Sequence, residues 1–83
     1  MDETLKVKVV ETVKSIMGID ILKMSSEKYF NTISEWDSFN NLMLISKFQD
    51  DFNIEFTAVE IENTKRIKDL FDLMDKKLNH KNK

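Results

Sequence analysis

The segment Glu35-Trp36-Asp37-Ser38-Phe39 contains the only tryptophan of this 83-residue chain and joins a polar loop to the most apolar helical pattern in the sequence. Asp and Ser are both preferred as helix N-caps, because their side-chain oxygens accept from backbone N–H groups that have no partner inside the helix. A serine hydroxyl at a helix N-terminus is also well placed to carry a phosphodiester, since free N–H groups and the positive end of the helix dipole favour an anion there. Local chemistry favours a cap and leaves modification of Ser38 as the alternative.

A helix is predicted over residues 38–52, directly after this junction. Its apolar residues recur at steps of three and four, as expected for one buried helical face. That face is predicted to consist of Phe39, Leu42, Ile45, Phe48 and Phe52, with Met43 and Leu44 widening it. The following Asn53-Ile54-Glu55-Phe56 alternates apolar and polar residues but has no second strand to pair with, so we predict an extended connector.

The N-terminal part of the chain predicts a helix over residues 2–17 and then a long connection. Apolar residues at Leu5, Val9, Val13 and Ile16 form one helical stripe, and Gly18, the only glycine, follows where a left-handed C-terminal cap is usual. Residues 19–37 contain no proline or glycine, and a structureless connection of this length is uncommon in a compact domain. We expect a short helical turn near residues 26–29 and attachment of the loop to the core through Ile21, Leu22, Phe30 and Ile33.

The C-terminal part predicts a short helix and a longer one. Thr57 and Glu60 have the spacing of a capping box that opens a helix to about residue 62. A final helix is expected over about residues 64–78, with a frayed tail over residues 78–83. Its buried face is predicted to contain Ile67, Leu70, Phe71, Met74 and Leu78. The fold class is therefore all-α: one domain over residues 1–83, built as a small antiparallel four-helix bundle with three longer helices, a short third helix and a long first loop.

Composition removes most catalytic and metal-binding classes. The chain has no cysteine, a single histidine (His80) in the tail and a single glycine, so it offers no Cys nucleophile, no Ser-His-Asp arrangement, no metal cluster and no glycine-rich phosphate loop. We predict that the chain is not an enzyme. Apolar runs are too short for a membrane span, and the N-terminus lacks a signal-peptide core, so a cytoplasmic protein without membrane insertion is expected.

Charge is distributed unevenly although the net charge is only −2. Residues 35–62 carry seven acids against Lys47 alone, and residues 63–83 carry seven bases against three acids. An acidic environment around Ser38 argues against nucleic acid as a partner and for a basic protein surface. A merely solvated charged surface explains the same pattern equally well.

The order of motifs resembles that of the acyl carrier protein family. The resemblance covers essentially the whole chain and is sharpest over residues 35–74. It rests on Trp36-Asp37-Ser38-Phe39 with Leu42 and Ile45, then on Phe52-Asn53-Ile54-Glu55-Phe56 and Ile67-Lys68-Asp69-Leu70. Such proteins have a long first helix, a long loop, an Asp-Ser-Leu motif that opens the second helix, a short third helix and a fourth.

This resemblance implies that Ser38 is the attachment site of 4′-phosphopantetheine, with Asp37 as its motif neighbour. The thiol of that arm would carry acyl or aminoacyl groups as thioesters, which a chain without cysteine cannot do by itself. The implied partners are a phosphopantetheinyl transferase and the enzymes that load or use the cargo, and a monomer is expected. The alternative is an unmodified helical interaction module in which Ser38 is only a helix cap.

Departures from the family pattern predict a specialised carrier. Trp36 and Phe39 stand where fatty-acid carriers usually have Gly or Ala and Leu, and Asn40, Met43 and Gln49 replace acids of the second helix. A stand-alone carrier for a polyketide, an unusual lipid, an aminoacyl product or a surface polysaccharide fits this better than one for housekeeping fatty-acid synthesis. Partner-binding residues are predicted to be Phe39, Met43, Glu60 and Ile61; core packing is an equal alternative for Phe39 and Ile61. The sequence does not determine whether the cargo enters the bundle.

Overall fold

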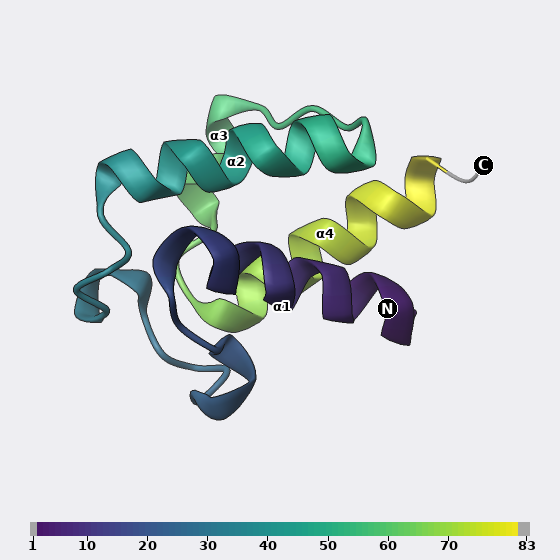
Figure 1. Ribbon diagram of the computed structural model, residues 1–83. Coiled ribbons are helices and arrows are strands. Elements are labelled where there is room, and N and C mark those ends of the chain that lie inside the picture. The colour runs from purple at the N-terminus through teal and green to yellow at the C-terminus, as the bar shows by residue number, and fades with distance from the viewer. Residues whose placement is uncertain (1, 82–83) are drawn as a thin grey trace.

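A computed structural model describes residues 2–81, and for residues 79–81 it describes the backbone alone. Within that range the chain is all-α, as predicted (Figure 1). The elements are α1 (Glu3–Met17), the 3-10 helices η1 (Ile21–Lys23) and η2 (Phe30–Thr32), α2 (Ser38–Phe52), α3 (Ala58–Asn63) and α4 (Ile67–Lys81). Each described helix falls short of the combined length and apolarity that a bilayer crossing requires.

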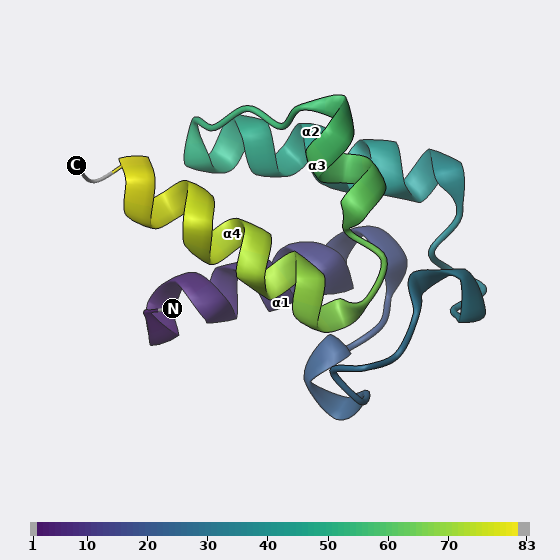
Figure 2. The same cartoon turned by 180° about the vertical axis from the view of Figure 1, so that it is seen from behind.

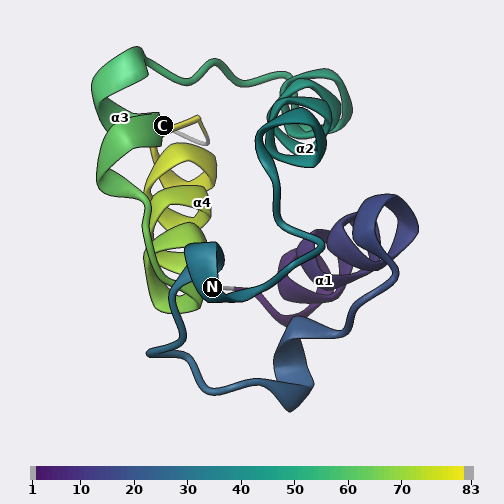
Figure 3. The ribbon, with the colours of Figure 1, turned by 90° about the vertical axis from the view of Figure 1, so that its left-hand side faces the viewer.

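The three long helices lie around one core, and the short α3 crosses beside them. Figure 1 shows α1 running in the opposite direction to α2 and α4, so the N-terminus of α1 and the C-terminus of α4 lie at one end of the molecule. Residues 53–57 return along α2 to α3, which is clear from behind (Figure 2). The end-on view in Figure 3 places α1, α2 and α4 around a common centre, with α3 on the side of α4. This arrangement leaves the first turn of α2, with Ser38, at the opposite end from both termini.

The helix boundaries follow from local capping chemistry. Asp2 caps α1 by accepting from the Thr4 backbone N–H at 2.7 Å. Gly18 ends α1 in the left-handed conformation (φ 73°), as predicted, because glycine adopts positive φ without steric cost. Asn53 ends α2 in the same conformation (φ 53°), which the sequence analysis did not anticipate although Asn is the usual second choice there.

Among the described residues the core consists of fifteen buried apolar side chains, and α1 and α4 contribute four each. Of the predicted stripes, Val9 and Val13 of α1 and Ile67, Leu70, Met74 and Leu78 of α4 are buried, whereas Leu5, Ile16 and Phe71 are only partly buried. The predicted buried face of α2 is wrong in its first half. Phe39, Leu42 and Met43 are 70%, 65% and 43% exposed, whereas Leu44 and Phe48 are buried. At about 100° per residue, Leu42 is turned about 160° away from Leu44 around the helix axis. Both stripes satisfy a helical period, and packing against α1 selects the one that contains Leu44 and Phe48.

The long loop has a turn at residues 26–27, closed by the Lys28 N–H to the Ser25 carbonyl at 3.1 Å, near the turn expected at residues 26–29, and contains two short 3-10 helices besides. Ile21, Phe30 and Ile33 are buried as predicted, but Leu22 is 56% exposed, so it does not attach the loop to the core. Asp20 fixes this choice by capping η1 through the Leu22 backbone N–H at 3.0 Å, which turns Ile21 inward. Trp36, at 7% exposure, is a core residue that the periodicity did not predict.

The loop is joined to the start of α4 by backbone and side-chain bonds. Tyr29 and Arg66 form an isolated antiparallel bridge, and Phe30 donates its backbone N–H to the Lys65 carbonyl at 2.9 Å. The Arg66 guanidinium lies over the Tyr29 ring, donates to its hydroxyl and pairs with Glu27 at 2.8 Å. These bonds place residues 26–30 against the first turn of α4 and so fix one wall of the region around Ser38.

Two boundaries in the last part differ slightly from prediction. The capping box of α3 is present with both of its bonds, Glu60 N–H to the Thr57 hydroxyl at 3.1 Å and Thr57 N–H to the Glu60 carboxylate at 2.9 Å. α4 begins at Ile67 rather than near residue 64, because Asp69 accepts from the backbone N–H groups of Lys65 and Arg66. It continues to Lys81, three residues past the expected end; the rest of the tail that was expected to fray, residues 82–83, lies outside the described residues.

Candidate functional site

Ser38 is the first residue inside α2, and Asp37 is its N-cap. The Asp37 carboxylate accepts from the Asn40 backbone N–H at 2.8 Å, and the Asp37 carbonyl accepts the first helical bond from the Asn41 N–H at 2.9 Å. The interpretation of Ser38 as the cap is therefore wrong. Its side chain is exposed, and within residues 2–81 its hydroxyl makes no hydrogen bond. The hydroxyl is accordingly accessible to a modifying enzyme.

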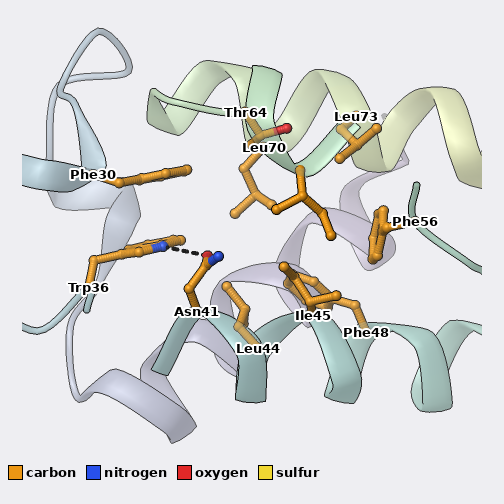
Figure 4. Close-up of a pocket in the computed structure, with 11 residues that line it drawn as sticks. Phe30, Trp36, Asn41, Leu44, Ile45, Phe48, Phe56, Thr64, Leu70 and Leu73 are labelled. Atoms are coloured by element: carbon orange, nitrogen blue, oxygen red, sulfur yellow. Dashed lines mark hydrogen bonds between the residues drawn. The ribbon is translucent and has the colours of Figure 1, made fainter. Parts of the chain in front are cut away.

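The loop before Ser38 is held to α2 from both sides of the junction. The Asn40 side-chain amide donates to the Glu35 carbonyl at 2.8 Å, and the Trp36 indole N–H donates to the Asn41 side-chain oxygen at 3.0 Å. Trp36 also stacks on Phe30, with ring centroids 3.9 Å apart and planes inclined by 5° (Figure 4). These contacts fix the direction from which the chain enters α2, and with it the position of Ser38.

An open groove lies beside Ser38 and is distinct from a small cavity inside the bundle. The groove has a volume of about 500 Å³ and includes Asp37, Ser38, Asn31 and Lys65 among its lining residues. The inner cavity has a volume of about 30 Å³, is partly open, and lies among Leu44, Ile45, Leu70 and Leu73 (Figure 4). Ile61 of α3 also lines it. Four side chains line both spaces and so form the partition between them: Phe30, Trp36, Asn41 and Thr64.

The outer face of α2 presents an apolar surface directly after Ser38. We call Phe39, Leu42 and Met43 the outer patch; their side chains are all exposed, at positions i, i+3 and i+4 of one helix face. No residue from 38 to 46 is charged. Contiguous exposed apolar side chains rimmed by polar residues mark interaction sites in soluble proteins. The outer patch is therefore a candidate contact surface next to the candidate attachment site.

The other two predicted partner-binding residues face inward or are already bonded. Glu60 is half-buried and pairs with Lys77 of α4 at 2.7 Å while it caps its own helix. The hydrogen bond from Lys77, joined by that from the Thr57 backbone, lowers the pKa of Glu60 below its ordinary value of 4.5, against the opposing effect of burial. Ile61 is half-buried and lines the inner cavity. The structure thus brings Asp37, Phe39 and Met43 to Ser38 but engages Glu60 and Ile61 within the bundle.

Sequence reasoning missed the partition residues Trp36 and Asn41. The signal for Trp36 was present, since tryptophan buries a large apolar area and its N–H usually finds a hydrogen-bond partner when buried. Asn41 gave no such signal, because a polar residue within an apolar helix pattern reads as a solvent-facing position. Its role in holding Trp36 becomes clear only in the structure, where its side-chain oxygen accepts a hydrogen bond from the Trp36 indole N–H.

Comparison with solved structures identifies one clear relative. An acyl carrier protein from Thermotoga maritima is 31% identical in sequence and has a TM-score of 0.71, and the match covers 94% of this chain and 91% of that one. No protein-family model matches the chain, and a search of curated proteins found no match either. Sequence identity above 30% across almost the full length of both chains shows that the two proteins belong to one family.

The chain belongs to the acyl carrier protein family. Membership supports a carrier role rather than a catalytic one, and interaction with biosynthetic enzymes.

Proposed function

We propose that this protein carries acyl or aminoacyl groups as thioesters on a 4′-phosphopantetheine arm attached to the Ser38 hydroxyl. The observation that carries the proposal concerns that hydroxyl: it is exposed, it makes no hydrogen bond to the described residues, and Asp37 rather than Ser38 caps the helix. When bound, the arm supplies the thiol that the cysteine-free chain lacks. A phosphopantetheinyl transferase attaches the arm, so Ser38 itself needs no activating base.

The residues around Ser38 fit such a group. The backbone N–H groups in the first turn of α2 have no carbonyl acceptor inside the helix. The Asp37 carboxylate accepts from the Asn40 N–H, which leaves the N–H groups of Ser38 and Phe39 for a phosphodiester. The groove beside Ser38 is open to solvent and includes Lys65 in its lining, and a positive charge there favours an anion nearby. Asp37 has the opposite charge, and its role is to hold the turn that presents Ser38.

The outer patch is proposed as the surface that partner enzymes contact. Phe39 and Met43 were predicted as partner-binding residues, and Leu42 joins them because it is 65% exposed on the same face. Aromatic residues and methionine are enriched at protein interfaces, and methionine adapts to differently shaped partners. An uncharged patch predicts encounters with little electrostatic steering, hence with weak salt dependence. Such a surface fits a specialised carrier whose partners differ from those of an acid-lined carrier.

The test is modification in the presence of a broad-specificity phosphopantetheinyl transferase and coenzyme A. Intact-mass measurement is expected to show the addition of one phosphopantetheine group to the native chain and none to Ser38→Ala. Ser46→Ala is the matched control, because Ser46 is also exposed on α2 and should leave the addition unchanged. An unmodified native chain, with the transferase active on another carrier, contradicts the proposal.

A further inference from the structure

The loop that forms one wall of the groove beside Ser38 is joined to α4 by the Arg66 side chain. Residues 29–31 contribute this wall. One terminal nitrogen of the Arg66 guanidinium donates to the Glu27 carboxylate at 2.8 Å, and the other donates to the Tyr29 hydroxyl. The guanidinium carbon lies 4.5 Å from the centre of the Tyr29 ring, so a cation–π contact joins the two hydrogen bonds. One side chain therefore holds two residues of the loop.

Arg66 is itself fixed to the fold. Asp69 accepts from the Arg66 backbone N–H at 3.0 Å, and the next residue, Ile67, is fully buried in the core. The loop has a similar arrangement, because Tyr29 is 42% exposed and the next residue, Phe30, is buried. The isolated bridge between Tyr29 and Arg66 thus joins two surface residues, each of which adjoins a core residue.

Three backbone hydrogen bonds accompany this contact. They run from the Phe30 N–H to the Lys65 carbonyl at 2.9 Å, from the Ile67 N–H to the Lys28 carbonyl at 3.1 Å, and from the Lys68 N–H to the Ser26 carbonyl at 2.8 Å. A two-stranded pairing is at best marginally stable in water, and short pairings open locally at a low cost in free energy. The Arg66 side chain therefore supplies contacts that this pairing needs to stay closed.

Phe30 connects the loop to the start of α2. Its ring stacks on Trp36 with centroids 3.9 Å apart, and the Trp36 indole N–H donates to Asn41 at 3.0 Å (Figure 4). Asn41 follows Ser38 by three positions, so the two residues are neighbours on the surface of α2. A continuous series of contacts therefore runs from Arg66 through the two rings to the helix turn that carries Ser38.

We propose that Arg66 is a positioning residue for the modification of Ser38. It holds residues 26–30 in the conformation that forms the groove wall, so the phosphopantetheinyl transferase does not have to order this loop when it binds. Ordering a loop on binding lowers affinity, and preorganisation removes that cost. The proposal rests on the proposed attachment of the arm to Ser38 and adds to it a residue outside the family motif.

Steady-state kinetics of the transferase, at saturating coenzyme A, compare the native chain with Arg66→Gln. We expect KM for the carrier to rise about threefold to fivefold, the size of effect of one exposed cation–π contact. We expect kcat to stay within about twofold, because the Ser38 hydroxyl and the Asp37 cap are unchanged. An unchanged KM, or a loss confined to kcat, overturns the proposal.

Tyr29→Leu removes the other side of the same contact and is expected to raise KM as much. Both residues lie on the surface, and this variant also tests the proposal if Arg66→Gln does not fold. The double variant should be no worse than either single variant, because substitutions that remove one shared contact are not additive. Additive losses would mean that Arg66 contacts the transferase directly, and they overturn the positioning role.

Lys68→Gln is the matched control. Lys68 pairs with the same Glu27 carboxylate at 3.1 Å, and its side chain is 43% exposed against 33% for Arg66. The substitution removes one positive charge from the same part of the surface but leaves the contact between Tyr29 and Arg66. Its KM is expected to stay within about twofold of the native value, as for a surface residue away from an interface. A rise equal to that of Arg66→Gln would assign the effect to charge and overturn the proposal.

Amide hydrogen exchange of the unmodified chain tests the loop without any transferase. Ile67 and Lys68 open α4, where backbone N–H groups have no acceptor inside the helix, so their protection depends on the bonds to the loop. Arg66→Gln is expected to lower protection of these two amides and of Phe30 at least about tenfold, with the Phe48 amide of α2 unchanged. Unchanged exchange at all three amides would show that Arg66 does not hold the loop, and overturns the proposal.

Failure of the proposed function gives a different result. The native chain then gains no phosphopantetheine group, with the transferase active on another carrier. Failure of the positioning role leaves the native chain modified and Arg66→Gln modified with the native KM.

Discussion

α1 and α2 have the same length of fifteen residues and pack against each other, yet their outer faces differ in chemistry. The exposed side of α1 is rich in charge, with Glu3, Lys8, Glu11 and Lys14. α2 exposes Phe39, Leu42 and Met43 instead, and carries no charge over its first nine residues. A helix that only covers a core needs a hydrated outer face, as α1 has. The first half of α2 lacks one, which supports our proposal that partner enzymes contact this face.

The two faces of α2 are the first place to test this difference. Phe48→Ala removes a fully buried ring from the contact with the core and is expected to lower the free energy of unfolding by about 3–5 kcal/mol. Leu42→Ala, on the outer patch, is expected to change it by less than about 0.5 kcal/mol. Urea unfolding measures both. Equal losses would mean that Leu42 is part of the core, contrary to its exposure.

The outer faces of α1 and α2 should also differ in their effect on partner enzymes. Phe39→Ser is expected to lower kcat/KM of the phosphopantetheinyl transferase by at least about tenfold, because aromatic side chains dominate binding at interfaces. Val7→Ser removes an exposed apolar residue from α1 and should leave the rate within about twofold, since surface substitutions away from an interface have small effects. A loss of rate in both variants, with unchanged melting temperatures, would show that the outer patch has no special role.

At the junction that opens α2, Asp37 and Ser38 have separate roles that substitution can distinguish. Asp37→Ala removes the cap and is expected to cost about 1 kcal/mol of unfolding free energy. Ser38→Ala should cost less than about 0.5 kcal/mol, because its hydroxyl is exposed and the cap remains. Chemical denaturation of the unmodified proteins is the measurement. If Ser38→Ala proved the more costly change, the hydroxyl would be structural after all.

The smallest expected effect is a pH-dependent change in the free energy of unfolding, caused by the Glu60–Lys77 pair between α3 and α4. The folded-state pKa of Glu60 is lowered below 4.5, so its contribution to stability is present above about pH 4.5 and is lost as the pH falls through the folded-state value. Glu60→Gln mimics the protonated acid, and the native chain is therefore expected to exceed it in unfolding free energy at pH 7 by more than at pH 3. Paired urea titrations at the two pH values measure this. A difference that does not depend on pH would exclude titration of Glu60 as the cause.

Much of the architecture could be predicted because it depends on neighbours along the chain. Caps, the one glycine and the apolar periods are local features, and they located α1 and α2 to within a residue and α3 through its capping box. Asp37 and Ser38 could be singled out for the same reason, although the sequence did not show which of the two caps the helix. A cap differs from the first helical residue only by backbone conformation, which both residue types accept.

The amino-acid sequence alone thus determined the four α-helices and the serine that opens α2, since each depends on contacts within a few residues. Only the tertiary structure decided which apolar stripe of α2 is buried, that Ile21 rather than Leu22 enters the core, and that Trp36 stacks on Phe30 between Ser38 and the interior. These choices depend on segments far apart in sequence. A helical period states that one face is apolar, but only the surface packed against it selects the face that leaves water.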